Sequence, residues 1–145
     1  MVSVRITGAK ELLRKLNALP GRVANKLVRR ALRAGAKPIV DEANATAPSQ
    51  IAPYGGQSPT VRLKGTFRVR AGKRNRLEVI VTTPKRSALG ISGDDQFYYP
   101  ALIEYGHGNV KPNPYLRTAH KRKGPEAARL VGANLGPAIE REARS

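Results

Sequence analysis

The large apolar side chains of this sequence are concentrated in residues 97–119, which read FYYPALIEYGHGNVKPNPYLRTA. Four of the seven Phe and Tyr residues of the chain lie near the start of this stretch: Phe97, Tyr98, Tyr99 and Tyr105. Because aromatic side chains bury large areas, we expect the core or an interface here. The apolar run from Phe97 to Ile103 predicts a strand that ends at Glu104.

A glycine corner and a helix start follow this run. Gly106 and Gly108 flank His107, and glycine tolerates a positive φ and close approach of the backbone. Asn113 is suited to the N-cap of a helix, and Pro114 to its first position, where the missing N–H would be unpaired in any case. The stretch therefore predicts a strand, a glycine corner and a capped helix.

The composition predicts one soluble domain with a strongly basic surface. The 145 residues suffice for a single core, and cysteine is absent. No apolar run is long enough to span a membrane, so no membrane partner is expected. The 27 Lys and Arg against 10 Asp and Glu give a net charge of +17 and are spread along the whole chain. Such a surface favours a polyanion or an acidic protein as its partner.

Two helices are predicted in the first third of the chain. Residues 9–19 place four leucines on one side and are followed by Pro20-Gly21. Residues 22–47 form the longest predicted helix, in which Pro38 should cause a kink or divide the helix in two. One half of its circumference is apolar, and the opposite half carries a row of cations: Arg22, Lys26, Arg29, Arg30, Arg33 and Lys37.

Strands are predicted at 61–70 and 77–81, with a turn at 72–76 between them, and a short further strand at 2–7. In residues 61–70, apolar side chains alternate with cations. A period of two places the apolar set on the core face of the sheet. The outer face then carries four cations: Arg62, Lys64, Arg68 and Arg70.

These elements predict a single α+β domain over residues 1–145. A small, mostly antiparallel sheet is expected to pack against the helix at 22–47. A C-terminal helical segment at 114–143, interrupted at Gly124-Pro125, is expected to lie beside it. Its apolar spacing is thin, so it should be marginal without a partner to pack on. The glycine- and proline-bearing stretches 49–60 and 85–96 are predicted to be mobile loops.

The sequence shows little sign of catalytic chemistry. The two histidines are not accompanied by carboxylates at a spacing typical of a zinc site, and no phosphate-binding glycine loop is present. Glu104 and His107 could form an acid–base pair, but a carboxylate that braces the glycine corner explains Glu104 as well. We therefore expect no enzyme activity, no cofactor and no metal.

The basic surfaces leave two interpretations open. The cations of the predicted helix and strand could neutralise a phosphate backbone, either as the lining of a DNA passage or in a basic nucleic-acid-binding protein without base specificity. They could equally dock acidic neighbouring proteins. No motif for reading bases accompanies them.

The order of motifs resembles the neck or tail-completion (head–tail joining) family of long-tailed bacteriophages. Members show Y-A-x-x-V-E-[FY]-G-T, a short loop and P-[FY]-L-R-P-A, which residues 99–106 and 114–119 approximate. The upstream G-x-x-E-L-x-x-x-L opening is matched by Gly8, Glu11, Leu12 and Leu16. Residues that match the motif are the candidates for an assembly interface: Tyr99, Glu104, Tyr105, Gly106, Pro114, Tyr115, Leu116 and Arg117.

This resemblance implies a structural virion protein. The expected assembly is a homo-oligomer, with a hexameric ring favoured, at the head–tail junction or the tail end. Its expected partners are neighbouring phage neck and tail proteins, with non-specific contact to packaged DNA. The expected location is the virion, with assembly in the host cytoplasm.

Overall fold

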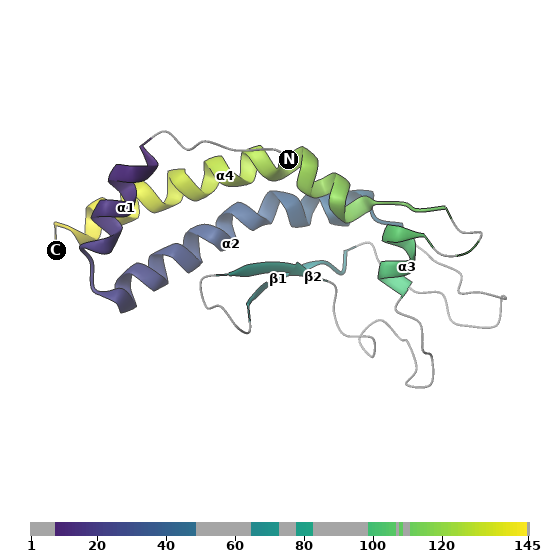
Figure 1. The fold of residues 1–145 in the computed structure, drawn as a ribbon, viewed down its shortest axis with the longest axis horizontal. Coiled ribbons are helices and arrows are strands. Elements are labelled where there is room, and N and C mark those ends of the chain that lie inside the picture. The colour runs from purple at the N-terminus through teal and green to yellow at the C-terminus, as the bar shows by residue number, and fades with distance from the viewer. Residues whose placement is uncertain are drawn as a thin grey trace. The chain divides into compact units, whose positions relative to one another are not determined.

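The computed structural model describes residues 8–48, 65–72, 78–82, 99–106, 108 and 111–144. These residues form an α+β structure that is mostly helical, as predicted (Figure 1). The predicted strand at 2–7, the loops at 49–60 and 85–96, and Arg62 and Lys64 lie outside the described residues. The elements are α1 (Ala9–Asn17), α2 (Gly21–Thr46), β1 (Arg68–Ala71), β2 (Val79–Thr82), α3 (Tyr99–Tyr105) and α4 (Tyr115–Glu142).

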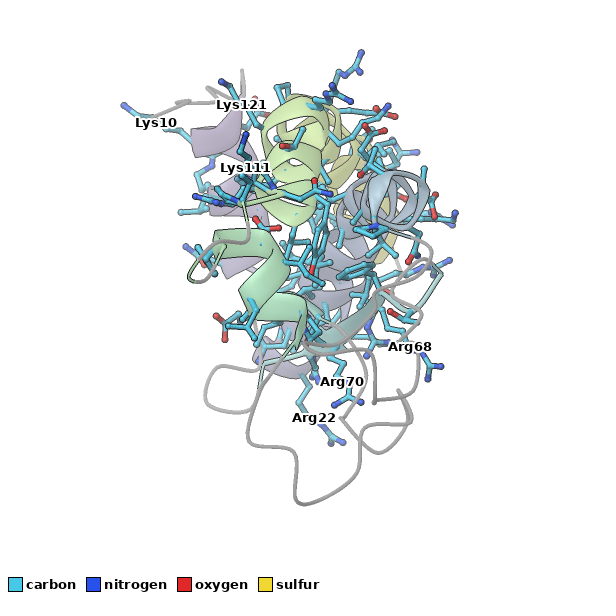
Figure 2. All side chains as sticks on the ribbon, turned by 90° about the vertical axis from the view of Figure 1, so that its right-hand side faces the viewer. Lys10, Arg22, Arg68, Arg70, Lys111 and Lys121 are labelled. Atoms are coloured by element: carbon cyan, nitrogen blue, oxygen red, sulfur yellow. The ribbon has the colours of Figure 1, made fainter. Side chains whose placement is uncertain are left out.

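The sheet is a two-stranded antiparallel hairpin of β1 and β2. The N–H of Gly72 donates to the carbonyl of Glu78 at 2.8 Å, where the turn begins. Arg68 and Arg70 are exposed and extend away from the ribbon in Figure 2, whereas Val69 between them is half-buried. This confirms the predicted alternation in β1.

The predicted strand at 61–70 is shorter than expected at its described end. Gly65 has a φ of 82°, which lies outside the β region and is accessible chiefly to glycine. The strand therefore begins only at Arg68, and the prediction that Gly65 and Thr66 continue it is wrong.

Contacts divide the chain into two packed units, and each has its own core. The first unit contains α1, α2 as far as Pro38, β1 from Val69, β2 as far as Ile80, and α4 from Lys123. Its core consists of two residues of α2 and two of α4: Leu27, Ala31, Leu135 and Ile139. Three leucines, Leu12 and Leu16 of α1 and Leu19 just after it, pack against this cluster. The predicted apolar face of α2 is thus confirmed. The predicted face of α1 is confirmed for Leu12, Leu16 and Leu19 but is wrong for Leu13, which is 60% exposed.

Helices α2 and α4 approach each other closely at Gly35 of α2. A Cβ atom at this position would lie 2.5 Å from the Cγ2 atom of Val131 and 2.7 Å from the backbone oxygen of Ala127. Any side chain would overlap these atoms, so the absence of one at Gly35 allows the two helices to approach.

The second unit is built around Phe67 and Tyr115. Their ring centroids lie 5.3 Å apart with the planes tilted by 54°. Three alanines are buried with these two rings: Ala43 in α2, Ala47 directly after α2, and Ala119 in α4. The Asn44 side chain accepts a hydrogen bond from the Phe67 N–H at 3.0 Å and donates to the Phe67 carbonyl at 3.4 Å. Asn44 therefore satisfies both backbone groups of Phe67 at the entry to β1.

Prolines do not divide the long helices. Helix α2 continues through Pro38, and α4 continues through Pro125 and Pro137. Of the two outcomes predicted at Pro38, division of the helix is wrong, and a kink stays a prediction. The prediction that Gly124-Pro125 separates two helices is also wrong. In α4 each proline follows a glycine, which lacks the Cβ that a proline ring would crowd in a helical conformation. In α2, burial of the apolar face outweighs the single missing N–H.

The run before the glycine corner is a helix, so the predicted strand there is wrong for its described part. Helix α3 begins at Tyr99 with Pro100 in its first turn, where proline is tolerated. Leu102 and Ile103 are adjacent in sequence, yet both pack on the core of the second unit. A strand would place adjacent side chains on opposite faces, whereas a helix lets both reach one cluster.

Substitution of Gly35 by alanine should destabilise the protein. The added methyl group would overlap Val131 and Ala127, and such overpacking costs about 1–3 kcal/mol. Gly21→Ala is the control, because a methyl group at that position would have no heavy atom within 4 Å of it. Denaturant unfolding should show a loss for Gly35→Ala and no loss for Gly21→Ala. Equal stability of the two variants would contradict the close contact.

Candidate functional site: the α3–α4 corner and the basic ridge of α2

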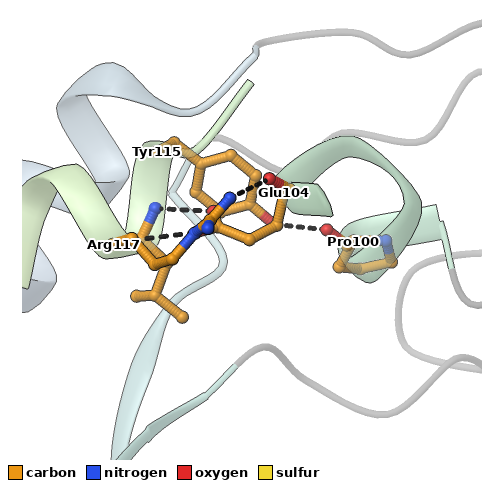
Figure 3. A network of polar contacts seen from close by, with 5 residues as sticks. Pro100, Glu104, Tyr115 and Arg117 are labelled. Atoms are coloured by element: carbon orange, nitrogen blue, oxygen red, sulfur yellow. Dashed lines mark hydrogen bonds and ion pairs between the residues drawn. The ribbon is translucent and has the colours of Figure 1, made fainter. Parts of the chain in front are cut away.

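The corner between α3 and α4 is held together by hydrogen bonds at several points (Figure 3). The buried Tyr115 hydroxyl donates to the Pro100 carbonyl at 2.9 Å. The Asn113 N–H donates to the Ile103 carbonyl at 2.7 Å. The first bond joins the first turn of α3 to the start of α4, and the second joins the end of α3 to the residues just before α4. Both ends of the corner are therefore fixed.

Glu104 caps α4 from the neighbouring helix. One carboxylate oxygen accepts the Leu116 N–H at 2.9 Å, and the other accepts the Arg117 N–H at 3.0 Å. These donors have no partner within their own helix, and a negative charge is favoured at a helix N-terminus. Hydrogen bonds to a charged group contribute about 1.5–3 kcal/mol each when buried. Glu104 is 4% exposed, so this cap is a main support of the corner.

The N-cap predicted at Asn113 lies one residue too early. The Pro114 carbonyl accepts the Thr118 N–H at 3.0 Å and α4 begins at Tyr115, so Pro114 occupies the N-cap position. Proline has no side-chain acceptor for the free N–H groups of the first turn. The Glu104 carboxylate supplies the acceptors that this position lacks.

Arg117 connects the buried carboxylate to the surface. Its Nε donates to Glu104 Oε1 at 3.0 Å, and its Nη2 donates to the Glu104 carbonyl at 2.9 Å. The guanidinium also lies 4.8 Å from the centroid of the Tyr105 ring, a cation–π geometry. Tyr105 is 66% exposed. The corner therefore presents an exposed aromatic ring against an arginine whose position is already fixed.

The predicted assembly residues occupy different places in this corner. Glu104 and Tyr115 are buried, Pro114 and Leu116 are half-buried, and Tyr105 and Arg117 are exposed. Gly106 has a φ of 76°, in the left-handed region expected of the glycine corner. Tyr99 is the first residue of α3. Among these candidates, Tyr105 and Arg117 combine exposure with large side chains.

A second surface, the basic ridge, lies on α2 and consists of Arg22, Lys26, Arg29, Arg30, Arg33 and Lys37. The ridge residues are exposed or half-buried, and none of them is buried. Among the residues that the structure describes, no ion pair involves Arg22, Lys26, Arg30 or Arg33. Residues 12–40 of the sequence contain no Asp or Glu. The predicted row of cations therefore lies on a solvent-accessible face.

The basic ridge works against the stability of its own helix. Four like-charged pairs are spaced four residues apart and two are spaced three apart, and each pair costs about 0.2–0.5 kcal/mol. The first turn of α2 contains no acidic residue. Cations near a helix N-terminus are also disfavoured by the helix dipole. The ridge is thus a feature that folding alone does not favour.

Among the described residues, little supports a catalytic or metal-binding site. Both carboxylate oxygens of Glu104 are used as hydrogen-bond acceptors, and His107 lies outside the described residues. Within the described ranges, no cluster of His, Cys, Asp or Glu is placed to hold a metal ion. None of the described helices is both long and apolar enough to cross a membrane.

Two contacts of the second unit were missed by sequence reasoning. One is the Asn44 bond pair to Phe67, and the other is the ion pair of Arg122 Nη1 with Glu42 Oε1 at 3.1 Å. Asn44 carries a weak signal, because asparagine is unfavourable inside a helix unless its side chain has a partner. The Arg122–Glu42 pair has no signal at all, since its partners are 80 residues apart.

Substitution of Gly106 by valine should destabilise the corner by more than about 1 kcal/mol, because a β-branched residue is strained at positive φ. Gly106→Asn is the matched control, since asparagine tolerates the left-handed region best among residues with a side chain. Thermal unfolding should rank the parent first, Asn next and Val last. A valine variant as stable as the parent would refute the role of this glycine.

Loss of the Glu104 cap should destabilise the protein. Glu104→Ala removes the acceptor for two backbone donors and for Arg117, at a cost of about 2–3 kcal/mol. Glu126→Ala removes an exposed ion pair with Lys123 at 3.0 Å, which should cost less than about 1 kcal/mol. Chemical denaturation of both variants measures the difference. Similar losses of unfolding free energy in the two variants would show that the contacts of Glu104 stabilise the protein no more than a surface ion pair does.

The comparisons with known proteins agree with the motif resemblance. The profile of the HK97-gp10-like family, described as "Bacteriophage HK97-gp10, putative tail-component", matches residues 10–106. The match covers 97 of the 145 residues and includes α2, the hairpin and α3. No curated protein and no solved structure is significantly similar to the chain. The chain therefore belongs to the HK97-gp10-like family of bacteriophage tail components.

Proposed function

We propose that this protein is a ring-forming subunit at the head–tail junction or tail end of a long-tailed bacteriophage, with a structural and non-enzymatic role. The observation that carries the proposal is the family match over residues 10–106. A homo-oligomer is proposed, with a hexameric ring favoured and with neck and tail proteins as neighbours. Its proposed location is the virion, after assembly in the host cytoplasm.

The α3–α4 corner supports an assembly role. Tyrosine and arginine are among the residues that most often dominate the binding energy of protein interfaces. Tyr105 and Arg117 are exposed side by side, and Arg117 is fixed by Glu104. A pair that is already ordered loses less conformational entropy when a partner binds. We therefore assign the Tyr105–Arg117 pair to an interface with a neighbouring subunit.

A closed ring needs two different patches on each subunit, because its interfaces are formed head to tail. The Tyr105–Arg117 pair would supply one of these patches. The single-domain organisation over 1–145 remains part of the proposal, with both packed units contributed by every subunit of the ring.

A basic nucleic-acid-binding protein without base specificity is the second candidate function. The observation that favours it is the basic ridge of α2. The two functions differ in what the isolated protein should do. The second requires tight, salt-sensitive binding of nucleic acid by the free subunit, whereas the structural role requires incorporation into virions.

Substitution of Tyr105 by alanine should abolish assembly while leaving the fold intact, because the Tyr105 side chain is exposed and contributes little to the core. Light scattering should show the loss of oligomers. Electron microscopy of phage carrying the variant should show heads and tails that fail to join. Tyr105→Phe keeps an aromatic side chain against Arg117, so this variant should assemble normally. Normal joining with Tyr105→Ala, or absence of the parent protein from purified virions, would disprove this assignment.

A further inference from the structure

We infer that the basic ridge of α2 binds the phosphate backbone of double-stranded DNA without reading its sequence. The inference deepens the second candidate function, from which it takes nucleic acid as the ligand, and it does not depend on ring formation. The ridge residues all belong to the first packed unit.

The ridge is a row that runs along the axis of α2. Its members recur at intervals of three and four residues from Arg22 to Lys37. With a rise of ~1.5 Å per residue, the row is about 22 Å long. The opposite face of α2 is buried through Leu27, Ala31 and Gly35. The cations therefore point away from the packed side, and Figure 2 shows Arg22 extending from the ribbon.

The charge in the middle of the ridge is not neutralised within the described protein. Lys26, Arg30 and Arg33 have no ion pair among the described residues. Their neighbours on the same face are further cations, which repel them along the helix. An opposite charge from outside would relieve this repulsion, so a polyanion is the natural partner.

The chemistry of the ridge face favours DNA over an acidic protein. Between Arg22 and Lys37, helical periodicity places no other side chain within the arc of α2 that the cations span, and the nearest residues beside it are Ala36 and Val23. Arginine is common in protein interfaces, but these interfaces are typically built on an aromatic or apolar centre, which the row of cations does not provide. Phosphate contacts require only cations and hydrogen-bond donors.

The same composition favours a duplex over a single strand. Proteins that bind single-stranded nucleic acid stack its bases on aromatic side chains, and the ridge face has none. Specific base readout is also not expected, because no motif for reading bases accompanies these cations. A duplex carries one charge per ~1.7 Å of its axis, so a row of this length can face several phosphates at once.

The test is the salt dependence of duplex binding by the full-length protein, measured by fluorescence anisotropy. Two short duplexes of unrelated sequence and one single strand serve as probes, over about 50–200 mM salt. The ridge variant is Lys26→Gln/Arg33→Gln. The matched control is Arg129→Gln/Arg144→Gln, which removes the same charge from exposed positions on and after α4. Arg129 lies on the side of α4 opposite Ala127 and Val131, which contact α2.

The parent should bind both duplexes alike and more tightly than the single strand. Because each lost phosphate contact lowers the slope of log K against log salt by about 0.9, the ridge variant should lose about 2 units of slope. The control should keep the slope of the parent. Thermal unfolding of the ridge variant should match or exceed that of the parent, since like-charge repulsion is removed. Tyr105→Ala should bind DNA as the parent does, which separates this test from that of assembly.

Several results would overturn the inference. Equal loss of slope in the ridge and control variants would mean that only net charge matters. Preference for one duplex or for the single strand would contradict a phosphate-only duplex surface. Absence of binding at about 50 mM salt would exclude it outright. Displacement of DNA by polyglutamate at equal charge concentration would indicate an acidic protein partner instead.

Discussion

The buried carboxylate of Glu104 is the interaction on which the α3–α4 corner depends. It accepts the N–H groups of Leu116 and Arg117 and so supplies the cap that Pro114 cannot provide. The same carboxylate fixes Arg117, which in turn lies over Tyr105. One acidic side chain thus links the start of the longest helix to the exposed aromatic residue. This is why a buried charge is tolerated here, since each of its oxygens has a donor.

Small residues allow close helix contacts in both packed units. In the first unit, the missing side chain of Gly35 lets Ala127 and Val131 approach α2. In the second unit, Ala43, Ala47 and Ala119 leave room for the rings of Phe67 and Tyr115. The described core contains few large aliphatic side chains, and Ile139 is the largest that is fully buried. Helix proximity therefore compensates for modest side-chain volume, because dispersion contacts require short distances.

The two surfaces of interest have opposite physical characters. The corner is ordered by its own hydrogen bonds and presents one aromatic ring and one arginine. The ridge carries like charges that its helix would be more stable without. The proposed virion role would give both surfaces a use. An ordered aromatic pair suits a specific protein neighbour, and a row of like charges suits a polyanion.

The sequence by itself determined the elements whose signal is local. The two-sided pattern of α2 and the alternation around Arg68 and Arg70 follow from side-chain periodicity, and the described structure confirms them. The leucine spacing of α1 is confirmed except for Leu13, which is exposed. The left-handed glycine at position 106 was also predictable, because few other residues adopt that conformation.

The tertiary structure decided what local patterns leave open. The short apolar run before Glu104 is compatible with a strand or a helix. It is helical because Leu102 and Ile103 both pack on the core of the second unit, while Glu104 binds the start of α4. The prolines of α2 and α4 interrupt a pattern but not a packed helix. The partners of Glu104, Asn44 and Arg122 were set by chain packing, since contacts between distant residues leave no periodic trace in sequence.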